Sequence, residues 1–202
     1  MGISRIGNIT GYGQIASGKR INKAADDAAG LAIVNKLKAS AKGTQAATQN
    51  TREGIHVTNI ADGGYNSIMD RLQSIHELSI KAMNGLNSAS DLQAIQGEID
   101  QHLQGIGEAA RNTIYNEQKL LDGSMATMEI ASNPTGKGSS IKMYSATLEK
   151  LGLDGYSVLG GEINLDAVTK AMEKVSSDRS KLGAAANGLE ARERANQIAY
   201  EN

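Results

Sequence analysis

The 202-residue sequence has no cysteine, no phenylalanine and no tryptophan, and it has only one proline and six tyrosines. The absence of cysteine excludes a disulfide framework and thiolate chemistry. The scarcity of large rings argues against a thick globular core, because a globule of this size would bury several of them. Its apolar residues are chiefly Ala, Leu, Ile and Met, which suit the narrow seams between long helices. We therefore expect an elongated, mainly helical protein.

Charge and hydropathy exclude further classes of protein. The formal net charge is −1, so no broad basic field is available to hold nucleic acid or an anionic membrane surface, and neither is expected as a partner. No apolar run approaches the ~20 residues that a membrane-spanning helix needs. The first ten residues are too polar and glycine-rich for a secretory signal peptide, so export, if it occurs, must use another route.

Residues 25–84 are predicted to form one long helix, after an irregular segment at 1–24 with at most one helical turn. The apolar residues recur at spacings of three and four. Gly54 and the Gly63-Gly64 pair are weak points, each costing about 1 kcal/mol relative to alanine, and we expect a kink there. Gly85 is the expected stop signal. The residues that carry the periodicity are Leu31, Val34, Leu37, Ala41, Ile68, Leu72, Ile75, Ser79 and Ala82.

A second helix is predicted from Ser90 to about Asn112. Ser90 and Gln93 have the spacing of a capping box, with Ser90 as the N-cap. The helix has a regular apolar stripe, which predicts that one face is buried. Thr113 to Gly123 loses the period and ends in a turn at Asp122-Gly123. The stripe consists of Leu92, Ile95, Ile99, Leu103 and Ile106.

The last third of the chain predicts a β-hairpin and a coiled-coil helix. Two short alternating runs, 125–130 and 141–148, flank the turn residues 133–138, which contain the only proline. Asn164 is then predicted to cap a final helix whose apolar positions fall into two seven-residue series. The first series is Val168, Val175, Leu182 and Leu189, and the second is Leu165, Met172, Arg179 and Ala186.

These elements predict a mainly α fold: an elongated antiparallel bundle of long coiled-coil-like helices with a small β-hairpin region, since amphipathic helices must bury their stripes on one another. We divide the chain into an N-terminal irregular segment or inner-core remnant (1–24), the N-terminal helices of a rod-like core (25–112), a hairpin region with a short variable loop (113–163) and a C-terminal core helix (164–202).

The run from Ser17 to Ile33 resembles the N-terminal signature of bacterial flagellin, and nearly every position agrees. The agreement continues in order through the rest of the chain, although Tyr115 and Glu117 replace the family's Phe and Gly. The signature residues are Ser17, Gly18, Arg20, Ile21, Asn22, Asp26, Asp27 and Gly30. The later blocks are Asp70–Leu78, Asn87–Ile99, Thr113–Gly123, Leu151–Tyr156 and Arg179–Leu189.

This resemblance implies an extracellular filament subunit that serves swimming motility. It implies packing of rod-like cores into protofilaments with other flagellin subunits. It also implies a flagellar export chaperone and unfolded export through the type III apparatus, without a cleaved signal peptide or a cofactor. The stretch before Ser17 is short, the chain ends at Asn202, and only 157–162 stands where flagellins insert outer domains. We therefore expect a core-domain form that lacks most terminal inner-core helices.

The resemblance also suggests a surface for host Toll-like receptor 5. Flagellins recognised by this receptor present an Arg and a Leu from one helix and an Ile and a Glu from the next. Here Leu78, Ile95 and Glu98 match, but the Arg position is Ser74. Loss of the guanidinium removes an interface anchor, so weakened recognition is expected.

Two other classes remain beside the filament subunit: a hook–filament junction protein and a helical adaptor or signalling module. Catalysis is not expected. Asp26 and Asp27 are adjacent and diverge by about 100° on a helix, so a helix start explains them better than a catalytic pair. His56, His76 and His102 are the only imidazoles, and none has the neighbours of a metal site, so no metal is expected.

Overall fold

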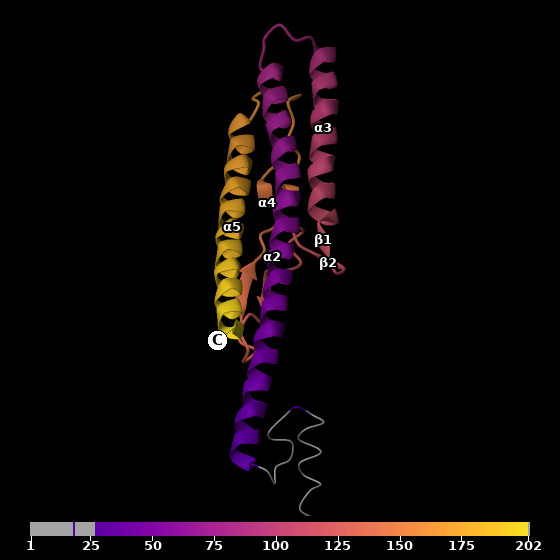
Figure 1. Ribbon diagram of the computed structural model, residues 1–202. Coiled ribbons are helices and arrows are strands. Elements are labelled where there is room, and N and C mark those ends of the chain that lie inside the picture. The colour runs from indigo at the N-terminus through magenta and orange to yellow at the C-terminus, as the bar shows by residue number, and fades with distance from the viewer. Residues whose placement is uncertain (1–17, 19–26, 202) are drawn as a thin grey trace, which may run out of the picture.

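The computed structural model describes Gly18 and residues 27–201. The predicted irregular segment 1–24 and most of the signature, including Asp26, therefore lie outside the described residues. Helices α2 (Ala28–Ala82), α3 (Ala89–Asn112) and α5 (Leu165–Glu201) run along a common axis, with α2 packed against both of the others (Figure 1). The predicted mainly helical, elongated fold is confirmed.

Helix α2 begins at Ala28, three residues after the predicted start at 25. Asp27 is the N-cap, and its carboxylate accepts a 2.8 Å hydrogen bond from the Gly30 backbone N–H. The helix is 55 residues long and continues without interruption through Gly54 and the Gly63-Gly64 pair. Packing on both sides of α2 outweighs the low helix propensity of these glycines.

The predicted glycine stop at Gly85 is wrong. Helix α2 ends at Ala82, its C-cap Met83 has a right-handed conformation, and Gly85 is not among the residues with positive φ. The side-chain amide of Asn87 donates to the carbonyls of Lys81 (2.7 Å) and Ala82 (3.2 Å). A side chain thus satisfies the helix-end carbonyls that a left-handed glycine would otherwise satisfy.

Helix α3 is capped two residues earlier than predicted. Ser88, not Ser90, is the N-cap: its Oγ accepts from the Asp91 N–H at 3.2 Å, while Asp91 Oδ2 accepts from the Ser88 N–H at 2.9 Å. The Ser88 hydroxyl also donates to Asp91 Oδ2 at 2.6 Å, and this bond, with the one from the Ser88 N–H, lowers the pKa of Asp91. Both serines have the correct spacing to an acceptor, but Asp91 adds a charge that complements the positive end of the helix dipole. The predicted end at Asn112 is confirmed.

Two hairpins and a short helix follow. Strands β1 (Ile114–Tyr115) and β2 (Gln118–Lys119) form a hairpin in a segment predicted to be irregular. Its turn residues Asn116 and Glu117 have φ of 47° and 65°, the left-handed region that tight hairpins require. The one predicted hairpin is confirmed as the second in the chain: β3 (Thr127–Ile130) pairs antiparallel with β4 (Ser139–Lys142). Its second strand begins two residues before the expected run 141–148 and ends at Lys142, and α4 (Leu148–Leu151) begins at the last residue of that run.

Helix α5 confirms one heptad series and corrects the other. Asn164 Oδ1 accepts from the Ala167 N–H at 3.1 Å, as predicted. The first series is buried, but the second is only half-buried, and Ala171 and Asp178 take the buried positions instead. Arg179 points to a carboxylate on α2, which places its neighbour Asp178 in the seam. The buried first series is Val168, Val175, Leu182 and Leu189.

Ion pairs fix the alignment of α5 along α2. The guanidinium of Arg179 donates to both carboxylate oxygens of Asp62, at 2.8 and 3.1 Å, and also to Asn66. The hydrogen bond that Arg179 donates to Asp62 raises the pKa of Arg179. Nearer the end of α5, Arg52 pairs with Glu193 at 2.6 Å. Because Arg179 binds both carboxylate oxygens of Asp62, this pair adds geometric specificity that a single point charge does not.

A buried amide and a tyrosine tie the segment before α5 to the helices. Gln96 on α3 accepts from the Val158 N–H at 2.7 Å and from the Ser157 hydroxyl at 3.1 Å. Tyr156 shares a 2.7 Å hydrogen bond with Ser79 on α2. Because each of these polar groups is paired, the segment packs against the core without a desolvation penalty.

The adjacent glycines Gly63 and Gly64 differ in how closely other side chains pack against them. A methyl carbon at Gly64 would lie 2.7 Å from Cδ1 of Leu121 and against the Thr113 side chain, whereas one at Gly63 would meet nothing within 4 Å. Gly64→Ala should therefore lower the free energy of unfolding by about 1–3 kcal/mol. Gly63→Ala should raise it by about 0.5–1 kcal/mol. Urea unfolding of both variants measures the difference, and equal effects at the two positions would contradict the packing described.

Candidate interaction surface

The four predicted receptor-facing residues lie on two helices that pack together, but they differ in how far they are exposed to solvent. Ser74 and Leu78 on α2 are half-buried, and Glu98 on α3 is exposed. Ile95 is only 4% exposed and belongs to the core. A partner approaching the rod therefore meets Glu98 and the edges of Ser74 and Leu78, and the expectation that Ile95 faces outward is wrong for this conformation.

The burial of Ile95 follows from the apolar stripe of α3. Ile95 lies four residues before Ile99, which is fully buried, so both face α2. The stripe itself was visible in the sequence, and it indicated a core position. Ser74 points back along its own helix, since its hydroxyl donates to the Asp70 carbonyl at 3.2 Å.

The described residues contain no arrangement that suits metal binding. Within Gly18 and 27–201, no group of three His, Asp or Glu side chains could hold an ion. The Asp27 carboxylate is engaged at the start of α2, as noted above, and the three histidines lie at separate positions on α2 and α3. None of the helices described combines the length and apolarity needed to cross a membrane.

Helix α2 continues past the end of α5 (Figure 1). Apolar side chains are exposed on this part of α2. Ile33 and Leu37, one helical turn apart, are 60% and 64% exposed. On α5, Ile198 and Tyr200 are also more than half exposed. We call Ile33 and Leu37 the proximal patch. Neither was predicted as a surface, and Leu37 had been assigned to the apolar stripe of the helix.

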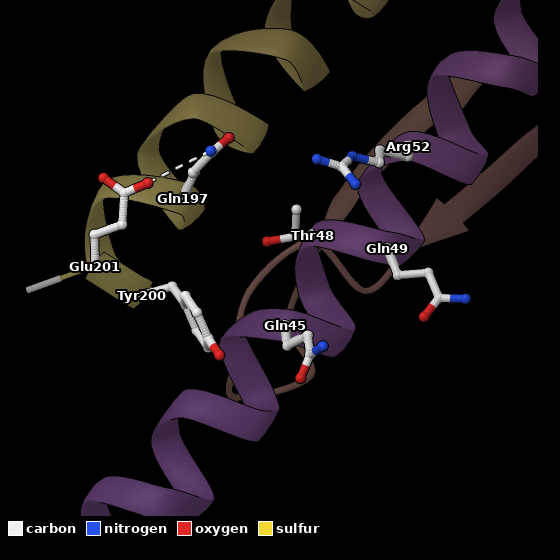
Figure 2. A pocket seen from close by; sticks show the side chains of 7 residues that line it. All are labelled: Gln45, Thr48, Gln49, Arg52, Gln197, Tyr200 and Glu201. Carbon is white, nitrogen blue, oxygen red and sulfur yellow. Dashed lines mark hydrogen bonds between the residues drawn. The ribbon is translucent and has the colours of Figure 1, made fainter.

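A groove lies between α2 and the last turn of α5 (Figure 2). Its volume is about 440 Å³, and every residue that lines it carries an amide, hydroxyl or charged group. Gln197 and Glu201 approach each other across one turn of α5, while Tyr200 extends toward α2. These amide, hydroxyl and ionic groups offer contacts but no paired acid and base. The lining residues are Gln45, Thr48, Gln49, Arg52, Gln197, Tyr200 and Glu201.

The opposite end of the rod carries a second apolar group, the distal patch. It consists of Ile80, Met83, Leu86 and Leu159, which come from the end of α2, the α2–α3 loop and the segment before α5. Leu86 is 90% exposed. Exposed apolar side chains thus concentrate at both ends of the rod, where soluble monomers seldom place them together without a partner.

Comparison with known proteins agrees with this architecture. The chain is 38% identical over 148 residues to the phase 1 flagellin of Salmonella naestved and to a flagellin of Salmonella budapest. The match covers 73% of this chain but only 29% of each relative, so the chain spans less than a third of their length.

Solved structures show the same fold. A Bacillus cereus flagellin superposes with a TM-score of 0.65 at 21% identity, covering 77% of this chain and 95% of that one. A putative flagellar hook-associated protein from Vibrio parahaemolyticus superposes with a TM-score of 0.73 at 13% identity, covering 88% and 95%. At these identities the likeness concerns the fold alone.

The family assignment comes from the sequence. Residues 12–126, more than half of the chain, match the family model of the bacterial flagellin N-terminal helical region. This family is structural rather than enzymatic. The long capped helix α2, the helix α3 that packs against it and the hairpin that follows lie within the matched range, and the chain belongs to the bacterial flagellin family.

Proposed function

We propose that this chain is a structural subunit of an extracellular bacterial flagellar filament that drives swimming. The observation that supports the proposal most strongly is the family match over α2, α3 and the first hairpin, on a rod with exposed apolar groups at both ends. Other copies of the chain are the proposed partners. Delivery by an export chaperone and the type III apparatus, without a cleaved signal peptide, belongs to the same proposal.

The two patches suit contact between copies. The proximal patch and the distal patch lie on different parts of one molecule, so a contact between them is head-to-tail and repeats without closing unless the rotation forms a ring. Removing apolar surface from water contributes roughly 25 cal/mol per Å². Ile33 and Leu37 are the largest exposed apolar side chains on α2 before α5 begins to cover it.

A hook–filament junction protein remains the second candidate, because the hook-associated structure from Vibrio parahaemolyticus has the same fold. The two functions differ in behaviour at a filament end: a filament subunit adds repeatedly, whereas a junction protein adds once and stops. A helical adaptor would do neither and would bind another partner instead.

Seeded assembly tests the proposal. Purified chain is added to short fragments of flagellar filament, and their lengths are measured by electron microscopy. We expect elongation by the unaltered chain and little or none by the Ile33→Ser, Leu37→Ser double variant, which loses the apolar contact. The matched control is Asn35→Ser with Ala39→Ser, exposed positions on the other side of the same helical turns, and it should elongate normally.

The outcomes separate the candidates. Binding of one layer without elongation would favour the junction protein and overturn the filament subunit. Absence of any binding to seeds would overturn both and leave the adaptor. Circular dichroism of each variant checks that α2 remains helical, so that loss of assembly is not confused with loss of the fold.

We also propose that Toll-like receptor 5 recognises this surface weakly. Glu98 is exposed and Leu78 is half-buried, so two of the expected contacts are accessible, while Ser74 supplies a short hydroxyl that is already bonded within its own helix. A guanidinium at this position would add donors and reach.

Ser74→Arg should therefore increase the response of receptor-expressing reporter cells, lowering the half-maximal concentration by roughly five- to tenfold, the effect of an interface anchor worth more than 1 kcal/mol. The matched control is Gln73→Arg, which adds the same charge at the neighbouring exposed position and should change little. An unaltered chain as potent as an arginine-bearing flagellin, with no gain from Ser74→Arg, would refute the weak-recognition hypothesis.

A further inference from the structure

The sequence contains two Asn-Gly pairs, Asn84-Gly85 and Asn187-Gly188. In such a pair the backbone nitrogen that follows the asparagine can attack the side-chain amide carbon, because glycine has no side chain to shield its nitrogen and has the backbone freedom to approach. From the sequence alone the two pairs are equivalent. Their surroundings in the fold are different.

Asn84 and Gly85 lie in the loop between α2 and α3, and both are exposed. No heavy atom lies within 4 Å of the position that a Cβ on Gly85 would occupy. Among the hydrogen bonds of the described residues, none uses the Gly85 N–H, although the neighbouring amides of Asn84, Leu86 and Asn87 all donate. The attacking nitrogen is therefore uncovered and is not held by an acceptor.

The amide of Asn84 is also activated. The Leu86 N–H donates to Asn84 Oδ1 at 3.2 Å. A donor at this oxygen polarises the amide, and it stabilises the negative charge that develops there when the tetrahedral intermediate forms. The Asn87 N–H donates to the Asn84 backbone carbonyl at 3.1 Å, which keeps the turn and this donor in place.

Three other asparagines in the described part of the chain lack this combination. Asn187 and Gly188 lie inside α5, where the helix geometry commits the glycine N–H to a backbone acceptor and holds it away from the preceding side chain. Asn133 precedes Pro134, which has no N–H to lose. The side-chain amide of Asn87 is engaged with two carbonyls at the end of α2.

We infer that Asn84 is a site of spontaneous deamidation and isoaspartate formation, and that Asn187 is protected from it by the helix. The Gly85 nitrogen loses its proton to solvent base and forms a bond to Asn84 Cγ. The Cγ–Nδ2 bond then breaks, and ammonia leaves with the proton returned by solvent. Water opens the resulting five-membered imide at either carbonyl, which gives aspartate or, with the main chain rerouted through the side chain, isoaspartate.

The product changes the distal end of the rod. A carboxylate appears two residues after the last residue of α2, at the end where the helix dipole is negative, so the charge is unfavourable there. It also appears between Met83 and Leu86 of the distal patch. Isoaspartate further adds a methylene to the main chain of a turn that two hydrogen bonds define. An isoaspartyl carboxyl methyltransferase is the class of enzyme that would act on this product.

Peptide mass spectrometry tests the inference on the full folded chain, incubated at mildly alkaline pH. We expect the Asn84 peptide to gain the mass of an amide-to-acid exchange and to accept methyl groups from an isoaspartyl methyltransferase. The Asn187 peptide should convert at least roughly tenfold more slowly, because α5 must open first. In denaturant the two rates should become similar, since the helix no longer distinguishes them.

Gly85→Ala provides the matched variant. Alanine fits at this position, because the space is open and φ is not positive. Its side chain should slow conversion at Asn84 several-fold and leave Asn187 unchanged. Equal or faster conversion at Asn187 in the folded chain, or a stable Asn84, would overturn the inference.

Discussion

The burial of α2 against α5 and α3 is the constraint on which the rest of this structure depends. A helix of 55 residues extends about 80 Å, and an isolated helix of this composition, with two adjacent glycines near its middle, would be marginal in water. Ile68, Leu72 and Ile75 are fully buried between its neighbours. The apolar seams therefore stabilise α2, and α2 in turn positions every other element.

Polar contacts then select one alignment of the seams. Apolar stripes alone allow helices to slide, since one heptad resembles the next. The Arg179–Asp62 fork and the Arg52–Glu193 pair fix α5 along α2, while Gln96 fixes the segment that leads into α5. On the rod that results, exposed apolar side chains gather mainly near the two ends, which is the basis of the proposed assembly.

The sequence predicted the parts of this structure that are governed by periodicity over many residues. The helices α2, α3 and α5, the cap at Asp27 and the second hairpin follow from spacing and local capping chemistry. Prediction from the sequence failed where two local structures were compatible with the same residues, or where a turn lacked its usual residue. Ser88 and Ser90 both fit a cap, and the tight hairpin at Asn116-Glu117 lacks the glycine that usually marks such turns.

Surface assignments were harder, because they depend on what covers a stripe rather than on the stripe itself. Leu37 was assigned to the apolar stripe of α2 and yet is 64% exposed. Ile95 was carried over as a contact residue and yet is buried by α2. Which part of a stripe a neighbouring helix covers is a tertiary fact that no local pattern contains.

Residue-resolved hydrogen exchange along α2 tests most directly whether tertiary burial, rather than helix propensity, stabilises this helix. Amides from Ala47 to Ala82, where α5, α3 and the hairpins pack, should exchange slowly and together, at a rate set by global unfolding. Amides from Leu31 to Ser40, where the side chains are mostly exposed, should exchange much faster. Uniform protection along the whole of α2 would contradict the account.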